Sequence, residues 1–205
     1  MNIYLLLYPQ MTLLDLIGPL QIWNQWPGAT LHLVAETMDP VRSDSAAAIL
    51  PTCTIDESTD APDILFVPGA ADGVLTALSN TSIVGYLGRQ GPNAGWVASV
   101  CTGSLLLGAA GLLQGYRATT HWAAMSALPS FGAEPVRSRW VIDGNRATGG
   151  GVTAGIDFGL ALMAKIAGDG VARAAQLAVE YAPAPPFRSG TPDEARASTL
   201  DQVER

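Results

Sequence analysis

The segment best suited to covalent chemistry is Ser99-Val100-Cys101-Thr102-Gly103, where an apolar strand pattern over 95–100 changes at once to a helical pattern over 102–113. Small residues two positions before and after a nucleophile permit the tight turn called a nucleophile elbow, here Ser-x-Cys-x-Gly. At the start of a helix, the dipole favours a thiolate, so we expect the pKa of Cys101 to lie below about 8.5. The alternative is a buried cysteine that packs as a small hydrophobic residue.

The other cysteine, Cys53, lies in the extended 49–55 segment, and we interpret it as structural. Two cysteines in 205 residues are no disulfide framework. The two histidines, His32 and His121, are far apart, and the sequence has no CxxC motif and no Cys/His cluster. We therefore expect no metal site.

A nucleophile needs a proton carrier, and Asp15 is the candidate because it stands in the apolar stretch Leu13-Leu14-Asp15-Leu16-Ile17. This stretch follows the first expected strand, at the sheet edge where Cys101 should lie. The alternative is that Asp15 is an acid at the N-cap or in the first turn of a helix.

A nucleophile also needs donors for the negative charge that develops during attack. Gly69 and Ala70 follow the strand expected at 63–68 and would present backbone N–H groups toward Cys101, as would the N–H of Thr102. The alternative is an ordinary strand-to-helix turn. The hydroxyl of Thr102 either bonds within the site or caps the helix.

Two further segments follow short extended stretches near the expected site. His121 comes after the stretch 117–120, and we favour a structural role for it over one in activation. The glycines of 149–151 precede a helical pattern and allow close approach of the backbone to a ligand or to the elbow. They form no phosphate loop, because the GxxxxGK[ST] spacing and its lysine are absent.

Strand-like and helix-like patterns alternate along the chain, which predicts an α/β fold with a mostly parallel sheet and helices on both faces. The apolar helix at 102–113 should lie in the middle of one layer or at a subunit contact. We expect a single domain over 1–190 and a charged tail over 191–205. Strands are expected at 3–8, 30–36, 63–68 and 95–100, a hairpin or edge excursion at 41–54, and a hairpin at 139–148. Helices are expected at 12–26, 102–113, 122–128, 153–167 and 170–181, and one or two helices at 71–90.

Composition excludes several classes of protein. Apolar residues make up 48% of the chain and charged residues 14%, which is globular and not disordered. The net charge is −7, Lys165 is the single lysine and the arginines form no stripe, so nucleic acid is not an expected partner. No apolar run is long enough for a membrane span or a signal peptide, so we expect a cytoplasmic protein with reduced thiols.

These motifs, in this order, resemble the PfpI/ThiJ superfamily. The resemblance rests on Asp15-Leu16-Ile17-Gly18-Pro19, Val67-Pro68-Gly69, the elbow, Ala118-Thr119-Thr120-His121-Trp122 and Gly150-Gly151-Val152-Thr153-Ala154-Gly155-Ile156-Asp157. It extends from about residue 2 to about residue 190. Within the superfamily, the Cys-Thr-Gly elbow and the segment 180–187 are most similar to the isonitrile hydratase branch.

The resemblance implies a flavodoxin-like three-layer sandwich that forms a homodimer and uses no cofactor. It also implies that Cys101 is the nucleophile, Asp15 the acid/base and Thr102 a hydrogen-bonding neighbour. Protease-like and deglycase-like members place a histidine directly after the cysteine, and Thr102 stands there in this chain, which counts against peptidase or amidase chemistry. The oxyanion turn is commonly Gly-Gly in the family, and here it is Gly69-Ala70.

The implied reaction begins with attack of the Cys101 thiolate on the terminal carbon of an isonitrile, while Asp15 manages the protons. A covalent thioimidate forms, water adds to its carbon, and departure of the thiolate leaves an N-substituted formamide. Isonitriles carry hydrocarbon groups, so the pocket should be largely apolar. Its expected lining is Ile17, Trp122, Gly150, Gly151 and Val152.

Two other functions stay open. The same domain occurs as the ligand-sensing half of transcription regulators with a C-terminal helix-turn-helix domain, for which we expect no room after the Pro-rich tail. A redox-responsive or carbonyl-directed member of the family would instead oxidise Cys101 or use it on a carbonyl substrate.

Overall fold

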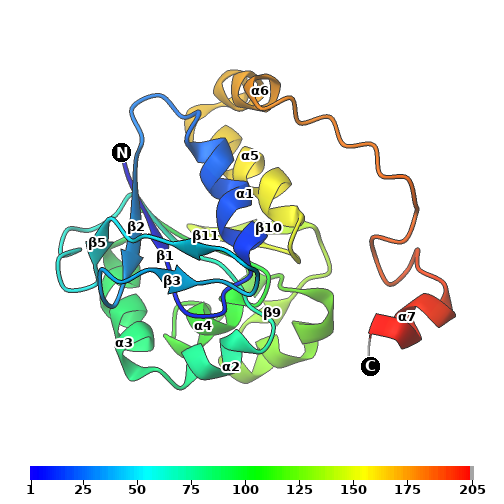
Figure 1. The fold of residues 1–205 in the computed structure, drawn as a ribbon, viewed down its shortest axis with the longest axis horizontal. Coiled ribbons are helices and arrows are strands. Elements are labelled where there is room, and N and C mark those ends of the chain that lie inside the picture. Colours follow the sequence, from blue (N-terminus) through cyan, green and yellow to red (C-terminus); the bar gives the residue numbers. More distant parts are fainter. Residues whose placement is uncertain (204–205) are drawn as a thin grey trace.

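A seven-stranded sheet in the order β10-β11-β7-β6-β1-β2-β5 forms the centre of the computed structural model, which describes residues 1–203 (Figure 1). Every neighbouring pair in this sheet is parallel except β10 and β11. The five central strands follow the flavodoxin-like order, which confirms the predicted fold class. The strands are β1 (Asn2–Leu6), β2 (Thr30–Ala35), β5 (Cys53–Thr54), β6 (Ile64–Val67), β7 (Trp96–Val100), β10 (Trp140–Asp143) and β11 (Arg146–Gly149).

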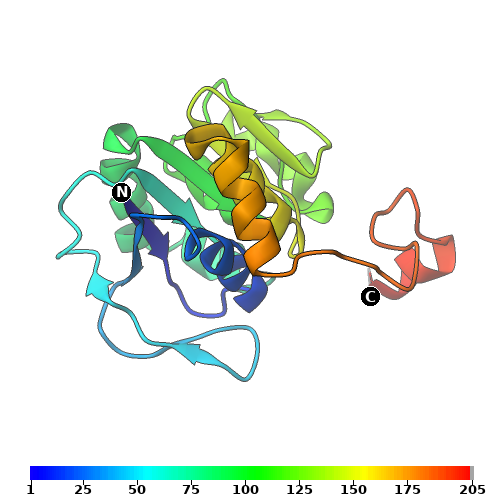
Figure 2. The ribbon, with the colours of Figure 1, turned by 90° about the horizontal axis from the view of Figure 1, so that it is seen from above.

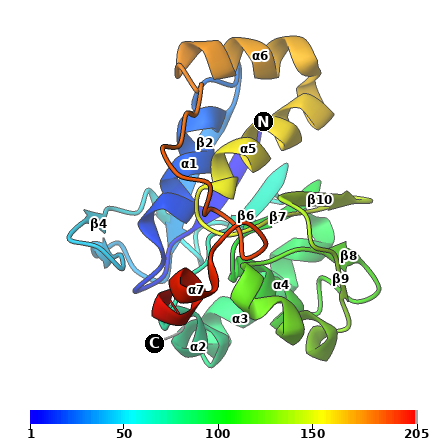
Figure 3. The same cartoon turned by 90° about the vertical axis from the view of Figure 1, so that its right-hand side faces the viewer.

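Helices cover both faces of the sheet, and the views of Figures 1 and 3 show the two layers. One layer holds α1 (Leu13–Trp23), α5 (Ala154–Ala167) and α6 (Asp169–Ala178), which pack on one another. The short helix α4 is buried from Gly103 to Gly108 and contacts α2, α3 and η2, so it lies in the middle of the other layer, as expected. That layer holds α2 (Gly73–Leu78), α3 (Thr81–Gln90), the 3-10 segments η1 (Gly91–Asn93) and η2 (Trp122–Phe131), and α4 (Gly103–Ala109).

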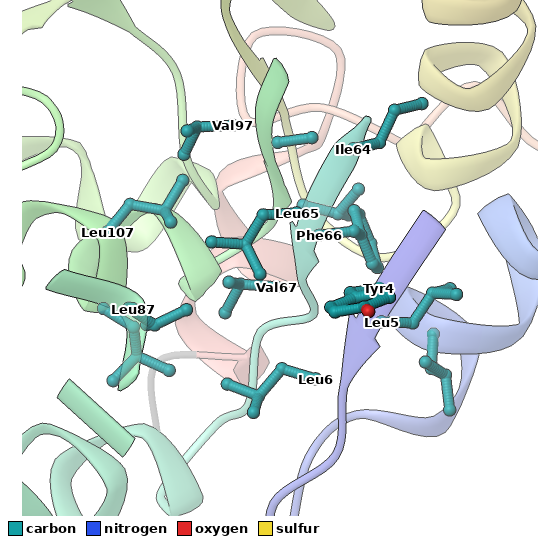
Figure 4. Close-up of a cluster of buried hydrophobic side chains, with 14 of the residues drawn as sticks. Tyr4, Leu5, Leu6, Ile64, Leu65, Phe66, Val67, Leu87, Val97 and Leu107 are labelled. Carbon is teal, nitrogen blue, oxygen red and sulfur yellow. The ribbon is translucent and has the colours of Figure 1, made fainter. Parts of the chain in front are cut away.

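The core is densest around the three central strands β1, β6 and β7. All four residues of β6 are fully buried, because helices cover the sheet on both sides. Figure 4 shows Leu65 and Val67 beside Leu87 and Leu107 of the α3/α4 layer. Burial on both faces explains why these strands are continuous apolar runs in the sequence. The same burial fixes the strand ends that carry the site.

Several segments differ in detail from the sequence prediction, and the helix expected at 102–113 is α4, which ends at Ala109. Between residues 41 and 54, β3 (Val41–Arg42) and β4 (Ala48–Ile49) form the expected hairpin, and β5 then joins the edge of the main sheet. The helix expected at 122–128 is a 3-10 helix that continues to Phe131 and ends at Gly132, whose φ of 73° is left-handed. Before and after it, β8 (Arg117–Ala118) pairs with β9 (Glu134–Pro135).

The chain leaves the packed domain after α6, at the half-buried Tyr181. Residues 182–203, here called the C-terminal arm, run outside the domain and end in α7 (Ala197–Val203), as Figures 1 and 2 show. The expected domain boundary at residue 190 falls within this arm. Among residues 1–203, no helix combines the length and the apolar character that crossing a membrane requires.

Candidate active site

The nucleophile elbow is formed by the junction between β7 and α4. Cys101 has a φ of 56°, in the left-handed region that non-glycine residues rarely adopt, and its backbone N–H donates to the carbonyls of Gly149 and Gly150 at 3.0 Å. A side chain on Gly103 would meet the carbonyl oxygen of Val67 at 2.3 Å, so this position requires glycine. Strain held by surrounding contacts is typical of functional positions.

Asp15 lies in the first turn of α1 and is fully buried beside Cys101. Its Oδ2 accepts a hydrogen bond from the backbone N–H of Gly69 at 3.0 Å. Its Oδ1 has no regular hydrogen-bond partner among the described residues, and the nearby Cys101 thiol interacts with the carboxyl group. A buried carboxyl oxygen without a fixed partner is costly in a structural residue, whereas a proton carrier needs such an oxygen.

Asp15 and Cys101 affect each other's titration. Burial raises the pKa of Asp15 to about 7, against the lowering effects of hydrogen bonds with Cys101 and Gly69. Burial, followed by the charge of Asp15, raises the pKa of the Cys101 thiol to about 12, although the backbone N–H groups of Thr102 and Val152 stabilise the thiolate. The expected lowering of this pKa by the helix dipole is therefore wrong, since desolvation and Asp15 outweigh the short helix α4.

The backbone N–H groups of Gly69 and Ala70 already donate hydrogen bonds within the protein. The prediction that they are free to stabilise charge on the substrate is therefore wrong. Gly69 donates to Asp15, and the Ala70 N–H donates to Thr102 Oγ1 at 2.9 Å. The backbone groups that contact the sulfur are those of Thr102, as expected, and Val152, which the sequence suggested only as a pocket wall. Gly69 instead serves close packing, because a Cβ there would lie 2.6 to 2.8 Å from Thr102, Cys101 and Asp15 atoms.

Hydroxyl groups fix the elbow from two sides. Thr102 Oγ1 donates to the carbonyl of Ala70 at 2.6 Å, so this side chain holds the elbow to the loop after β6 and does not cap α4. Thr120 Oγ1 donates to the carbonyl of Cys101 at 2.9 Å. Thr120 was not singled out from the sequence, although the Thr-Thr-His stretch places it next to a residue that was.

Tyr8 is a second residue that the sequence did not indicate. Its side chain is 1% exposed, and its hydroxyl donates to the carbonyl of Pro68 at 2.8 Å. Burial, and then the charges of Asp15 and Cys101, raise its pKa well above the usual value, so the phenol stays neutral. Only the folding of the segment after β1 brings this tyrosine toward the pair.

His121 packs against the glycine loop after β11. Its Nδ1 accepts a hydrogen bond from the N–H of Ala123 at 3.4 Å, and its ring would collide at 2.3 Å with a Cβ on Gly151. Burial lowers the pKa of the imidazole. The neutral ring thus begins η2 and supports the loop that carries Val152, in keeping with the structural role favoured from the sequence.

A cavity of about 660 Å³ lies on the outer side of this loop. Trp122, Gly150, Gly151 and Val152 line it as expected, while Ile17 is not part of its lining. The expectation of a largely apolar pocket is wrong, because Arg137, Arg139 and Asp193 also line this cavity. Cys101 lies on the inner side of this loop, where its backbone N–H donates to the carbonyl of Gly150. The loop 150–152 therefore lies between Cys101 and the cavity, and Cys101 is not among the residues that line it.

Known proteins are similar to this chain over most of its length. The model of the DJ-1/PfpI family matches residues 1–165. The chain is 46% identical to isonitrile hydratase of Pseudomonas putida over 205 residues, which cover all of this chain and 89% of that protein. It is 30% identical to the HTH-type transcriptional regulator GbdR of Pseudomonas aeruginosa over 80% of this chain, but only 46% of that regulator.

Solved structures show the same fold. The crystal structure of a ThiJ/PfpI family protein from Pseudomonas syringae has a TM-score of 0.96 at 44% identity, and the match covers 98% of this chain and 84% of that chain. DJ-1beta of Drosophila melanogaster has a TM-score of 0.80 at 19% identity, covering 89% of this chain and 98% of that one. By sequence and by fold, this chain belongs to the DJ-1/PfpI family.

Proposed function

We propose that this protein is an isonitrile hydratase, which converts R–NC and water to an N-substituted formamide without a cofactor. The observation that carries the proposal is the buried pair of Asp15 and Cys101, in which a carboxyl oxygen without a regular partner lies beside a thiol. The name of the Pseudomonas putida relative supports the choice of substrate.

The first step forms a carbon–sulfur bond. Cys101 Sγ attacks the terminal isonitrile carbon while Asp15 accepts the thiol proton, and Asp15 then returns this proton to the same carbon. The product is a thioimidate, R–N=CH–S–Cys, which contains every atom of the isonitrile and of the thiol. A carboxyl with a pKa of about 7 suits both directions of transfer near neutral pH.

The second step releases the product. Water adds to the thioimidate carbon, one of its protons reaches nitrogen, and the carbon–sulfur bond breaks with its electron pair on sulfur. The other proton returns to sulfur through Asp15, which restores the resting pair. The Thr102 and Val152 N–H groups support the departing thiolate.

Burial of the thiol favours this function over redox sensing. Cys101 is 5% exposed, whereas the cysteines of redox sensors are typically accessible to the oxidant. We also propose that the protein forms a homodimer, as the resemblance implies, and that it acts in the cytoplasm, as the sequence analysis expects.

The test is production of formamide from simple alkyl and aryl isonitriles. Wild type should turn over, Cys101→Ala should not, and Asp15→Asn should be severely impaired. No turnover by a folded wild type whose Cys101 still reacts with thiol reagents would overturn the proposal, and it would favour ligand sensing or carbonyl chemistry at the same elbow.

A further inference from the structure

The cavity outside the elbow has two unequal walls. The inner wall belongs to the domain, with Trp122 and Met125 of η2 and the loop 150–152. The outer wall belongs to the C-terminal arm, through residues 190–193 and Leu200 of α7. Without the arm, the cavity would be an open depression on the surface of the domain.

The arm stands away from the domain. In the described part of the chain, its backbone hydrogen bonds are internal, such as those from the N–H groups of Glu194 and Ala195 to the carbonyl of Thr191. Residues 182–191 are exposed throughout, and three of them are prolines, which favour an extended and semi-rigid chain. The arm therefore encloses space and does not fill it.

This space is large for a reaction at one carbon atom. A volume of about 660 Å³ falls in the range of pockets that hold drug-sized ligands. Trp122, Met125 and Leu200 supply apolar surface from both walls, and Arg137, Arg139 and Asp193 place charged groups in the same lining. The isonitrile carbon must reach Cys101, so the cavity can receive only the remainder of the substrate.

We propose that the C-terminal arm is the outer wall of the substrate cavity, with Leu200 limiting the size of the group it accepts. The substrates would then be isonitriles with a bulky body. This inference rests on the proposed function for its choice of substrate, but its geometry concerns any reagent that reaches Cys101 through the cavity.

The arm is a shared feature and not an accident of this chain. The Pseudomonas syringae crystal structure superposes on 98% of the chain, so the alignment includes most of the arm. The match to Drosophila DJ-1beta uses 98% of that protein and still leaves about a tenth of this chain unmatched.

The proposal is tested with a substitution in the arm that makes the cavity smaller. Leu200→Trp places a larger ring on the outer wall, and Val203→Trp, on the same helix, places the same ring at an exposed position outside the cavity. Two ratios are measured: turnover of naphthyl isonitrile against methyl isonitrile, and alkylation of Cys101 by a naphthyl-bearing iodoacetamide against iodoacetamide, followed on the Cys101 peptide by mass spectrometry.

We expect Leu200→Trp to lower both ratios about tenfold or more, as steric discrimination in a pocket typically does, and Val203→Trp to leave both unchanged. Equal ratios in the two variants would overturn the proposal that the arm forms the outer wall of the cavity. If Leu200→Trp lowers the alkylation ratio but neither isonitrile is turned over, the arm forms the outer wall of the cavity and the proposed hydratase function is wrong. Wild type that turns over methyl isonitrile but not naphthyl isonitrile would overturn the bulky substrate class.

Discussion

The two cysteines of this protein occupy contrasting regions of one sheet. Cys53 lies in the two-residue edge strand β5, half-buried, with ordinary extended backbone. Cys101 follows the central strand β7, has a left-handed φ of 56° and faces a buried carboxyl group. Burial raises the pKa of both thiols. What distinguishes Cys101 is therefore its acid partner and its fixed backbone, and not a lowered pKa of the thiol.

Removing each thiol gives the sharpest contrast. Cys101→Ala should reduce formamide production to the uncatalysed level, because no other group in the pair can bond to the substrate carbon. Cys53→Ser should keep activity within about twofold, as expected for a surface change far from the site. Steady-state turnover of the isonitrile by both variants is the measurement. A large loss of activity in Cys53→Ser would contradict the assignment of the reaction to Cys101 alone.

Substitution of Asp15, the acid partner of Cys101, should have the second-largest effect on activity. Asp15→Asn keeps an acceptor for the Gly69 N–H but cannot take a proton, so kcat should fall by about 10²–10⁴. Glu57→Gln, which removes a carboxylate near Cys53, is the matched control and should leave kcat unchanged. Equal activity of Asp15→Asn and wild type would show that Cys101 transfers its proton elsewhere.

Close packing at the elbow predicts a smaller but clear effect. Gly69→Ala forces a Cβ to within 2.6 to 2.8 Å of three site residues and should destabilise the fold by about 1–3 kcal/mol, with a loss of activity. Gly170→Ala, where nothing lies within 4 Å, should be neutral or stabilising. Urea unfolding of both variants makes the comparison, and equal midpoints would contradict the tight packing.

The pH dependence should carry the signature of Asp15. Its carboxyl must be ionised to accept a proton, so kcat/KM should rise through about pH 7, and Asp15→Asn should lose this rise. In the folded state the carboxyl holds its proton up to about pH 7, whereas in the unfolded chain it loses it near 3.8. Folding stability from this group is thus complete below pH 3.8 and is lost as pH rises to 7.

That loss amounts to at most about 4 kcal/mol, at about 1.4 kcal/mol for each pKa unit. Asp15→Asn should therefore gain thermal stability relative to wild type as pH rises from 4 to 8. Melting temperatures across this range provide the measurement. Parallel curves for the two proteins would mean that Asp15 is not buried as an acid.

The Thr102 hydroxyl should have the smallest effect. Thr102→Val keeps the shape of the side chain but leaves the Ala70 N–H and carbonyl without their partner, at a cost of about 1–3 kcal/mol in stability. Because the hydroxyl holds the loop and does not contact the sulfur, kcat should fall less than in Asp15→Asn. A loss as large as that of Asp15→Asn would assign the hydroxyl a direct part in the reaction.

The sequence predicts the sheet well because its central strands are buried on both faces and leave continuous apolar runs. The elbow is equally visible, because tight turns demand small residues at fixed spacing. The interaction of Asp15 with Cys101 is not visible in the sequence, since the burial of both residues and their placement side by side depend on elements far apart in the chain. The engaged N–H groups of Gly69 and Ala70, and the contact from Val152, likewise follow from three loops meeting at one edge.

The central claim is a covalent bond between Cys101 and the isonitrile carbon. Wild type mixed with an isonitrile and quenched within one turnover should show, on the Cys101 peptide, a mass increase equal to the whole isonitrile. This adduct should decay as the formamide appears. Formamide production without an adduct at Cys101, or at an equal rate in Cys101→Ala, would contradict the account.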